Sequence, residues 1–137
     1  MNKRNEIDTI KKIFSITRTI AVVGLSPDPE KPSHYVPSYL QQHGFKIIPV
    51  YPKTANKILN ERVYKDLKDI PLNIDTVLIF RRAEYVLPHI EDAIKIKAKA
   101  VWLQDGIINY EARELAENNG LLFIMDRCMY VEHRKLN

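Results

Sequence analysis

The sequence contains a single cysteine, Cys128, among 137 residues. One cysteine cannot form a disulfide within the chain, which is typical of proteins in a reducing compartment, so we expect a cytoplasmic protein. The four histidines show no ligand spacing with Cys128, and no metal site is predicted. No apolar run reaches the ~20 residues that a membrane span needs, and residues 1–16 lack the continuous apolar segment of a secretory signal. We therefore expect neither a membrane protein nor a secreted one.

Basic residues are in slight excess, but they form no dense run. Lys and Arg number 21 against 17 Asp and Glu, which gives a net charge of +4 and an isoelectric point of about 9.1. Clustered Lys and Arg with interleaved aromatic residues would indicate a nucleic-acid-binding surface, and without them no nucleic-acid partner is expected. A mildly basic chain also suits a small ligand with several negative charges. For most of the lysines, a solvated surface position is the default interpretation.

Short apolar runs alternate with amphipathic segments along the chain, and this alternation predicts the fold. The length fits one domain over residues 1–137, with an N-terminal helix at 5–16 and a core at 18–134. Strands are expected at 19–24, 45–50, 75–80, 100–103 and 121–125, with helices between most of them. This cadence indicates βαβ units. The predicted fold class is α/β: a doubly wound, Rossmann-like parallel sheet in a three-layer α/β/α arrangement, as a single domain.

Several residues are expected to mark the ends of elements. Pro37 is predicted in the first turn of a helix that opens near Ser33, because proline further inside would remove a backbone hydrogen bond. Pro88 is predicted in the first turn of the next helix, and Asn109 is predicted to cap the one after it. Residues 54–71 have the weakest periodicity, and residues 63–64 are predicted there as a short edge strand.

The stretch Thr19–Tyr39, TIAVVGLSPDPEKPSHYVPSY, contains the main local indication of a ligand. A strand ends on Gly24, a proline-containing loop follows, and a helix opens near Ser33. Backbone N–H groups and the positive end of the helix dipole converge at such a turn, which makes it an anion site able to hold a diphosphate. A tight turn without a ligand is the alternative interpretation, with Ser33 as a helix cap.

The residues beyond the predicted strands indicate which nucleotide would fit. In a parallel α/β sheet, ligands bind beyond the carboxyl ends of the strands, where Lys53 and Arg81 are expected. The dinucleotide fingerprint G-x-G-x-x-G with an acidic residue after the second strand is absent, as is the Walker pattern GxxxxGK[ST]. The first loop reads GLSPDP and the second strand ends in VYPK. Because a lysine would attract a phosphorylated ribose, coenzyme A (CoA) with its 3′-phosphate and NADP with its 2′-phosphate both qualify.

Four segments taken together resemble a known family. VVGLSPDPEKPSHYVPSYLQQHGFKIIPVYPK, VLIFRRAE, VWLQDGI and MDRCMYVEH are similar, in the same order, to small stand-alone CoA-binding proteins with a Rossmann-like domain. The resemblance runs from about Ile16 to Arg134, and it implies a relation to the CoA domain of the succinyl-CoA synthetase α subunit. It also implies ligand contacts at residues 24–27, Lys53, Gln104 and Gly106. The synthetase keeps its phosphorylated histidine in a further domain, which we do not expect in this chain.

The combined prediction is a module that binds CoA or an acyl-CoA, with no catalytic residue and an undetermined oligomeric state. The alternatives left open are an NADP-linked oxidoreductase, an acyl-transfer enzyme that uses Cys128 with His133 as base, and a sensor of redox state or CoA level. Cys128 is interpreted first as a small buried residue after the last strand. The predicted ligand-contacting residues are Gly24, Leu25, Ser26, Pro27, Ser33, His34, Tyr35, Lys53, Phe80, Arg81, Gln104 and Gly106.

Overall fold

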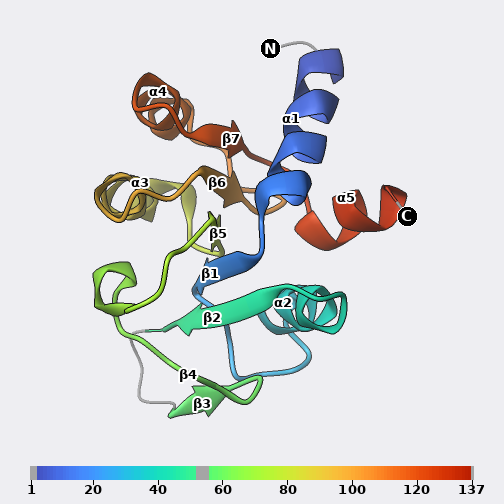
Figure 1. Ribbon diagram of the computed structural model, residues 1–137, viewed down its shortest axis with the longest axis vertical. Helices are drawn as coiled ribbons and strands as arrows, with labels where there is room; N and C mark the ends of the chain where they lie inside the picture. Colours follow the sequence, from blue (N-terminus) through green and yellow to red (C-terminus); the bar gives the residue numbers. More distant parts are fainter. Residues whose placement is uncertain (1–2, 52–55, 137) are drawn as a thin grey trace.

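Five parallel strands form the central sheet of the computed structural model, which describes residues 3–51 and 56–136. Their order across the sheet is β2-β1-β5-β6-β7 (Figure 1). The elements of the main fold are, in chain order, α1 (Lys3–Ile16), β1 (Thr19–Val23), α2 (Pro32–Gln42), β2 (Lys46–Val50), β5 (Thr76–Ile79), α3 (Leu87–Lys95), β6 (Ala100–Leu103), α4 (Tyr110–Asn118), β7 (Leu122–Ile124) and α5 (Met129–Lys135). Two short strands, β3 (Lys57–Ile58) and β4 (Glu61–Arg62), and two 3₁₀ turns, η1 (Leu67–Asp69) and η2 (Ala83–Tyr85), lie in the connections around β5. None of these described helices has the length and apolar character needed to cross a membrane.

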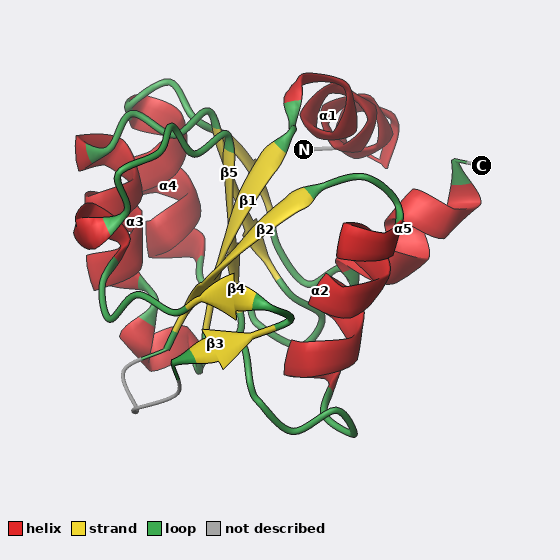
Figure 2. Ribbon diagram, turned by 60° about the horizontal axis from the view of Figure 1, so that its bottom comes forward, coloured by secondary structure: helices red, strands yellow, loops and turns green. Residues whose placement is uncertain are grey.

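Helices cover both faces of the sheet, α3 and α4 on one and α1, α2 and α5 on the other (Figure 2). Because successive side chains of a strand point to opposite faces, β1 contributes Ala21 and Val23 to the first layer and Ile20 and Val22 to the second. Every residue of β5 and β6 is buried, which explains why these strands read as continuous apolar runs. The predicted doubly wound sheet between two helical layers is confirmed.

Two of the predicted helix starts are also confirmed. Pro88 lies in the first turn of α3. The side-chain oxygen of Asn109 accepts the backbone N–H of Ala112 at 2.9 Å and caps α4. The side-chain nitrogen of Asn109 donates to the backbone carbonyl of Ala83, also at 2.9 Å. This one side chain therefore joins the start of α4 to the segment that follows β5.

The predicted position of Pro37 is wrong. Helix α2 begins at Pro32 with Lys31 as its N-cap residue, so Pro37 lies in the second turn and Ser33 is not the cap. A proline has no N–H to donate to the carbonyl four residues earlier, here that of Ser33. This carbonyl instead accepts the N–H of Ser26 at 3.0 Å. The proline is tolerated inside the helix because the loop before the helix supplies the missing donor.

Two other segments differ from the prediction. In place of a strand at 63–64, the chain forms the antiparallel β3–β4 pair, and Tyr64 makes a single parallel bridge to Val50. Helix α5 was not predicted, because its seven residues are too few to show a clear period. Contacts with residues that are distant in sequence, such as those around His133, stabilise this helix, and the helix propensity of its own residues is not what forms it.

The rings around His133 form an aromatic cluster that packs α5 against neighbouring elements of the fold. The His133 ring lies 5.1 to 5.6 Å, between centroids, from the rings of Phe14, Tyr39, His43 and Phe45. Its Nδ1 is hydrogen-bonded to the Tyr39 hydroxyl at 2.9 Å. The cluster therefore ties α5 to α1, α2 and the start of β2.

We expect the free energy of unfolding to fall as the pH is lowered from 7.5 to 5.0. Burial, and then the charge of Arg81, lower the pKa of His89; burial, and then His43, lower the pKa of His133. The unfolded chain, with histidine pKa values near 6.5, therefore binds protons more readily than the folded one. The stabilisation of the folded state by its two neutral histidines is fully present above pH ~6.5. It is lost as the pH falls through the lower pKa values that His89 and His133 have in the folded protein. Urea unfolding at the two pH values checks it.

The matched control for this prediction is the double variant His89→Gln/His133→Gln. The free energy of unfolding of this variant should depend less on pH between 5.0 and 7.5, because it lacks the two histidines. Carboxyl groups in general titrate mainly below this pH range and contribute little within it. An equal pH dependence in the two proteins would contradict the assignment to these histidines.

Candidate functional site

A cleft of about 700 Å³ lies beyond the carboxyl ends of β1, β5 and β6. The chain continues from β1 to β2 on one side of the sheet and returns to β5 on the other, so this is the point where the strand order reverses. The cleft is lined by residues from the start of α2, from the segments after β5 and β6, and from the start of α5: Lys31, Pro32, Ser33, Tyr35, Val36, Phe80, Arg81, Arg82, Ala83, Glu84, Gln104, Asp105, Gly106, Ile107 and Cys128.

The turn at Gly24 fixes the wall between β1 and β5. Gly24 has a φ of +86°, and a Cβ atom there would lie 2.6 Å from the backbone oxygen of Phe80. The Phe80 N–H donates to the Val23 carbonyl at 2.9 Å, and the Gly24 N–H donates to the Val50 carbonyl at 2.8 Å. Only glycine combines this backbone conformation with so close an approach. Leu25, the next residue, is fully buried and belongs to the core behind the wall.

Ser26 organises the loop that precedes α2. Its hydroxyl accepts the Asp28 N–H at 3.0 Å, and its own N–H donates to the Ser33 carbonyl described above. The Ser26 carbonyl lies 2.7 Å from His34 Nδ1, and because a carbonyl can only accept, this ring nitrogen carries the proton. Ser26 is 7% exposed. Its contacts position the start of α2 and leave the cleft surface to Lys31, Ser33 and Tyr35.

Positive side chains line two walls of the cleft. Lys31 and Arg82 are exposed, and Arg81 is half-buried with its guanidinium carbon 5.4 Å from the Tyr85 ring centroid. Within the described residues, none of the three basic side chains forms an ion pair with a carboxylate. The cleft also contains Glu84 and Asp105, so positive charge is in modest excess. Such a lining favours an anionic ligand.

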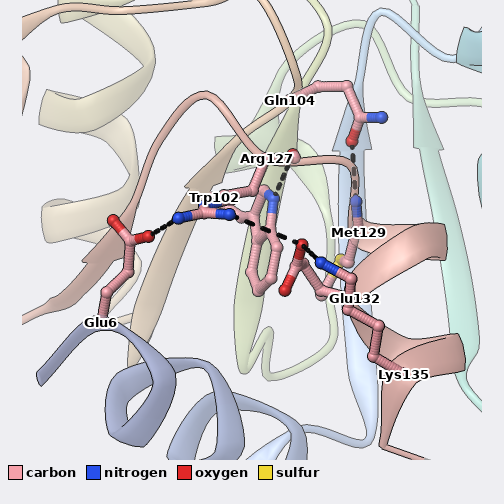
Figure 3. Close-up of polar contacts among 7 residues, drawn as sticks. All are labelled: Glu6, Trp102, Gln104, Arg127, Met129, Glu132 and Lys135. Atoms are coloured by element: carbon pink, nitrogen blue, oxygen red, sulfur yellow. Dashed lines mark hydrogen bonds and ion pairs between the residues drawn. The ribbon is translucent and has the colours of Figure 1, made fainter. Parts of the chain in front are cut away.

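Gln104 and Cys128 form the wall between β6 and α5. Gln104 is 5% exposed, and its side-chain oxygen accepts the backbone N–H of Met129 at 3.2 Å (Figure 3). The buried Trp102 donates its indole N–H to the Arg127 carbonyl at 2.8 Å. Cys128 therefore lies between two anchored residues, and its side chain is half-buried at the cleft.

Arg127 and Gly106 complete the support of this wall. The Arg127 guanidinium forms an ion pair with Glu6 of α1, which also appears in Figure 3. Gly106 has a φ of +84°, and its N–H donates to the Asp126 carboxylate at 2.8 Å. The turn after β6 is thus hydrogen-bonded to the segment after β7.

The structure places half of the predicted site residues at the cleft. Ser33, Tyr35, Phe80, Arg81, Gln104 and Gly106 line it, whereas Gly24, Leu25, Ser26, Pro27 and His34 do not. Lys53 lies outside the described residues. Lys31, Arg82, Glu84, Asp105 and Cys128 also line the cleft and were not predicted as contacts. Arg82 and Asp105 are next to predicted residues, and Cys128 follows a predicted strand on the same sheet edge.

The described residues of the cleft do not contain a catalytic pair of the predicted kind. His133, the candidate base for Cys128, lies in the aromatic cluster, and no histidine lines the described part of the cleft. In the part of the chain that the structure describes, no group of three or more His, Cys, Asp or Glu side chains could hold a metal ion. The arrangement is suited to binding an anionic molecule with an apolar portion.

Comparison with known proteins shows what this chain is similar to. Residues 18–134 match the family described as CoA binding domain. The chain is 39% identical over 124 residues to the YneT protein of Bacillus subtilis (strain 168), covering 90% of this chain and 91% of YneT. A hypothetical protein from Pyrococcus horikoshii OT3 has a similar structure, with a TM-score of 0.90 and 37% identity over 95% of this chain and 91% of that one.

Part of a larger enzyme is similar as well. A dinucleotide-forming acetyl-coenzyme A synthetase from Ca. Korarchaeum cryptofilum matches 80% of this chain but only 26% of its own, with a TM-score of 0.68 and 27% identity. The same fold therefore occurs both as a small protein and as a fraction of a synthetase.

Proposed function

Because the chain belongs to the CoA-binding domain family, as its sequence motifs indicated, we propose that it binds coenzyme A or an acyl-CoA in the cleft at the switch point of the sheet. The protein acts as a binding module and performs no chemistry on the ligand. The proposed contacts are the six predicted residues that line the cleft, together with Lys31, Arg82 and, from the sequence, Lys53.

The position and lining of the cleft carry this proposal. CoA has phosphate groups at its nucleotide end and an uncharged arm with two amides that ends in a thiol. Lys31, Arg81 and Arg82 suit the phosphates, and the start of α2 adds the positive end of a helix dipole. Tyr35 and Phe80 offer apolar and aromatic surface. A volume of about 700 Å³ is within the ordinary range for sites that hold a ligand of this kind.

Two observations support binding without catalysis. The acetyl-coenzyme A synthetase contains a similar part that makes up 26% of its chain, so most of that enzyme has no counterpart in the match. In this protein the only cysteine lies at the cleft, but its candidate base His133 is held by Tyr39 in the aromatic cluster. A nucleophile without a neighbouring base is poorly suited to thioester chemistry.

We expect CoA to bind more tightly than NADP and at least about tenfold more tightly than NAD. NAD lacks the ribose phosphate, and one charge-assisted contact to phosphate is worth about 1.5–3 kcal/mol, or ten- to a hundredfold in affinity. Isothermal titration calorimetry with the three ligands under reducing conditions measures these affinities.

Equal or tighter binding of NAD would contradict the proposed ligand, and tighter binding of NADP would favour the oxidoreductase alternative. Acetyl-CoA incubated with the protein under the same conditions should remain intact. Thioester cleavage that is lost in Cys128→Ser would contradict the non-catalytic role.

A further inference from the structure

Cys128 is a nucleophilic group at the cleft to which the proposed function gives no role. It is the only cysteine in the chain, and its half-buried side chain contributes to the cleft wall.

Hydrogen bonds on both sides of Cys128 fix its position. The preceding carbonyl, of Arg127, is held by the Trp102 indole, and the following N–H, of Met129, is held by Gln104 (Figure 3). Trp102 is fully buried and Gln104 nearly so. Cys128 therefore lies between two hydrogen-bonded backbone groups at the cleft wall.

Gln104 places a side-chain amide at the same wall of the cleft as Cys128. Its side-chain oxygen is engaged with Met129, but its amide nitrogen has no hydrogen-bond partner among the described residues, and Figure 3 shows this nitrogen on the other side of the amide. Gln104 is 5% exposed and lines the cleft. Among the described residues this nitrogen is not one of the buried polar atoms that lack a partner, so it is accessible, and a ligand with a carbonyl or hydroxyl oxygen at this wall can accept its N–H. The arm of CoA has amide carbonyls followed by a terminal thiol.

We propose that Cys128 is a modification site at which CoA becomes attached through a mixed disulfide. The inference rests on the proposed function, because the cleft must first bind the nucleotide. The reactant is CoA disulfide. The Cys128 thiolate attacks one sulfur of this disulfide, the bond between the two CoA sulfurs breaks, and the Cys128–CoA disulfide forms. The second CoA leaves as a thiolate and takes up a proton equivalent to the one that Cys128 released, so no further oxidant is needed.

The sequence determines how long this adduct persists. With no other cysteine in the chain, no internal thiol can attack the mixed disulfide, and an external thiol must remove it. The bound CoA then no longer exchanges with free CoA. Occupancy of the site therefore responds to the ratio of thiol to disulfide in the surrounding CoA pool.

The test compares three disulfides with the full-length protein: CoA disulfide, pantethine, which lacks the nucleotide, and glutathione disulfide. Adduct formation is followed by intact-protein mass spectrometry and located by peptide mapping. We expect CoA disulfide to modify Cys128 at least about tenfold faster than the other two, because binding raises the effective concentration of the reacting sulfur. Desulfo-CoA, which has no thiol, should suppress this advantage by competition.

The controls separate this inference from the proposed function. Cys128→Ser should form no adduct, and protein unfolded in urea should react with the three disulfides at similar rates. If CoA binds by calorimetry but CoA disulfide reacts no faster than glutathione disulfide, the modification site is contradicted and the binding function stands. If CoA does not bind at all, the proposed function itself is contradicted.

Discussion

Replacement of Gly24 by alanine is expected to lower the free energy of unfolding by about 2–5 kcal/mol. At a φ of +86° an L-residue is strained by about 1–2 kcal/mol, and the new Cβ atom would lie 2.6 Å from the Phe80 backbone oxygen. Relieving that overlap requires a backbone shift, for which overpacking costs of about 1–3 kcal/mol are typical. Urea unfolding measures the loss. Because Phe80 lines the cleft, CoA affinity should fall as well.

Gly120→Ala is the matched control for this variant. Gly120 has a similar φ of +79°, but a Cβ atom there would have nothing within 4 Å. Its replacement should therefore cost only the backbone strain of about 1–2 kcal/mol. Equal losses in the two variants would show that the contact between Gly24 and Phe80 is not a constraint on the β1 turn.

Replacement of Lys53 by alanine is expected to weaken CoA binding by about ten- to a hundredfold, with a much smaller effect on 3′-dephospho-CoA. Lys53 follows β2, which ends at Val50 on the sheet edge where the cleft lies. If its ammonium group pairs with the ribose 3′-phosphate, its removal forfeits a charge-assisted contact of about 1.5–3 kcal/mol, and only the phosphorylated ligand loses it. Calorimetric titration of both ligands against both proteins measures the difference.

Lys95→Ala controls for the general effect of removing a positive charge. Lys95 is exposed at the end of α3, whereas the cleft lies near the start of that helix, so its replacement should leave both affinities nearly unchanged. Equal losses for CoA and dephospho-CoA in Lys53→Ala would place the ribose phosphate elsewhere, and Arg81 would be the next residue to replace.

Gly24 follows β1 in the sequence and Lys53 follows β2, so both predictions concern the sheet edge formed by the carboxyl ends of the strands. This edge was predictable from the sequence. Buried parallel strands must be apolar on both faces, so TVLI and AVWL identified β5 and β6 without ambiguity. Their carboxyl ends share one edge in any parallel sheet. For this reason Phe80, Arg81, Gln104 and Gly106 could be predicted at this edge, and the structure has all four in the cleft lining.

The sequence could not distinguish the residues that line the cleft from those that support it. Gly24, Leu25 and Ser26 belong to the loop that the motif highlights, yet none of them lines the cleft, and Leu25 and Ser26 are buried. Their orientation depends on contacts with segments that are distant in sequence, such as that between Gly24 and Phe80. Pro37 was misplaced for a related reason, because the rule that excludes proline from a helix interior assumes that no outside donor replaces the lost N–H.

The sequence by itself determined the order of the five sheet strands and of the helices up to α4, the family, and the sheet edge where the cleft lies, because these follow from local patterns of burial and from motifs. Only the tertiary structure decided that residues 129–135 form a helix and that Cys128 lines the cleft. Both depend on the hydrogen bonds from Trp102 to Arg127 and from Met129 to Gln104. Each bond joins positions 25 residues apart, and no local pattern reports on contacts at that separation.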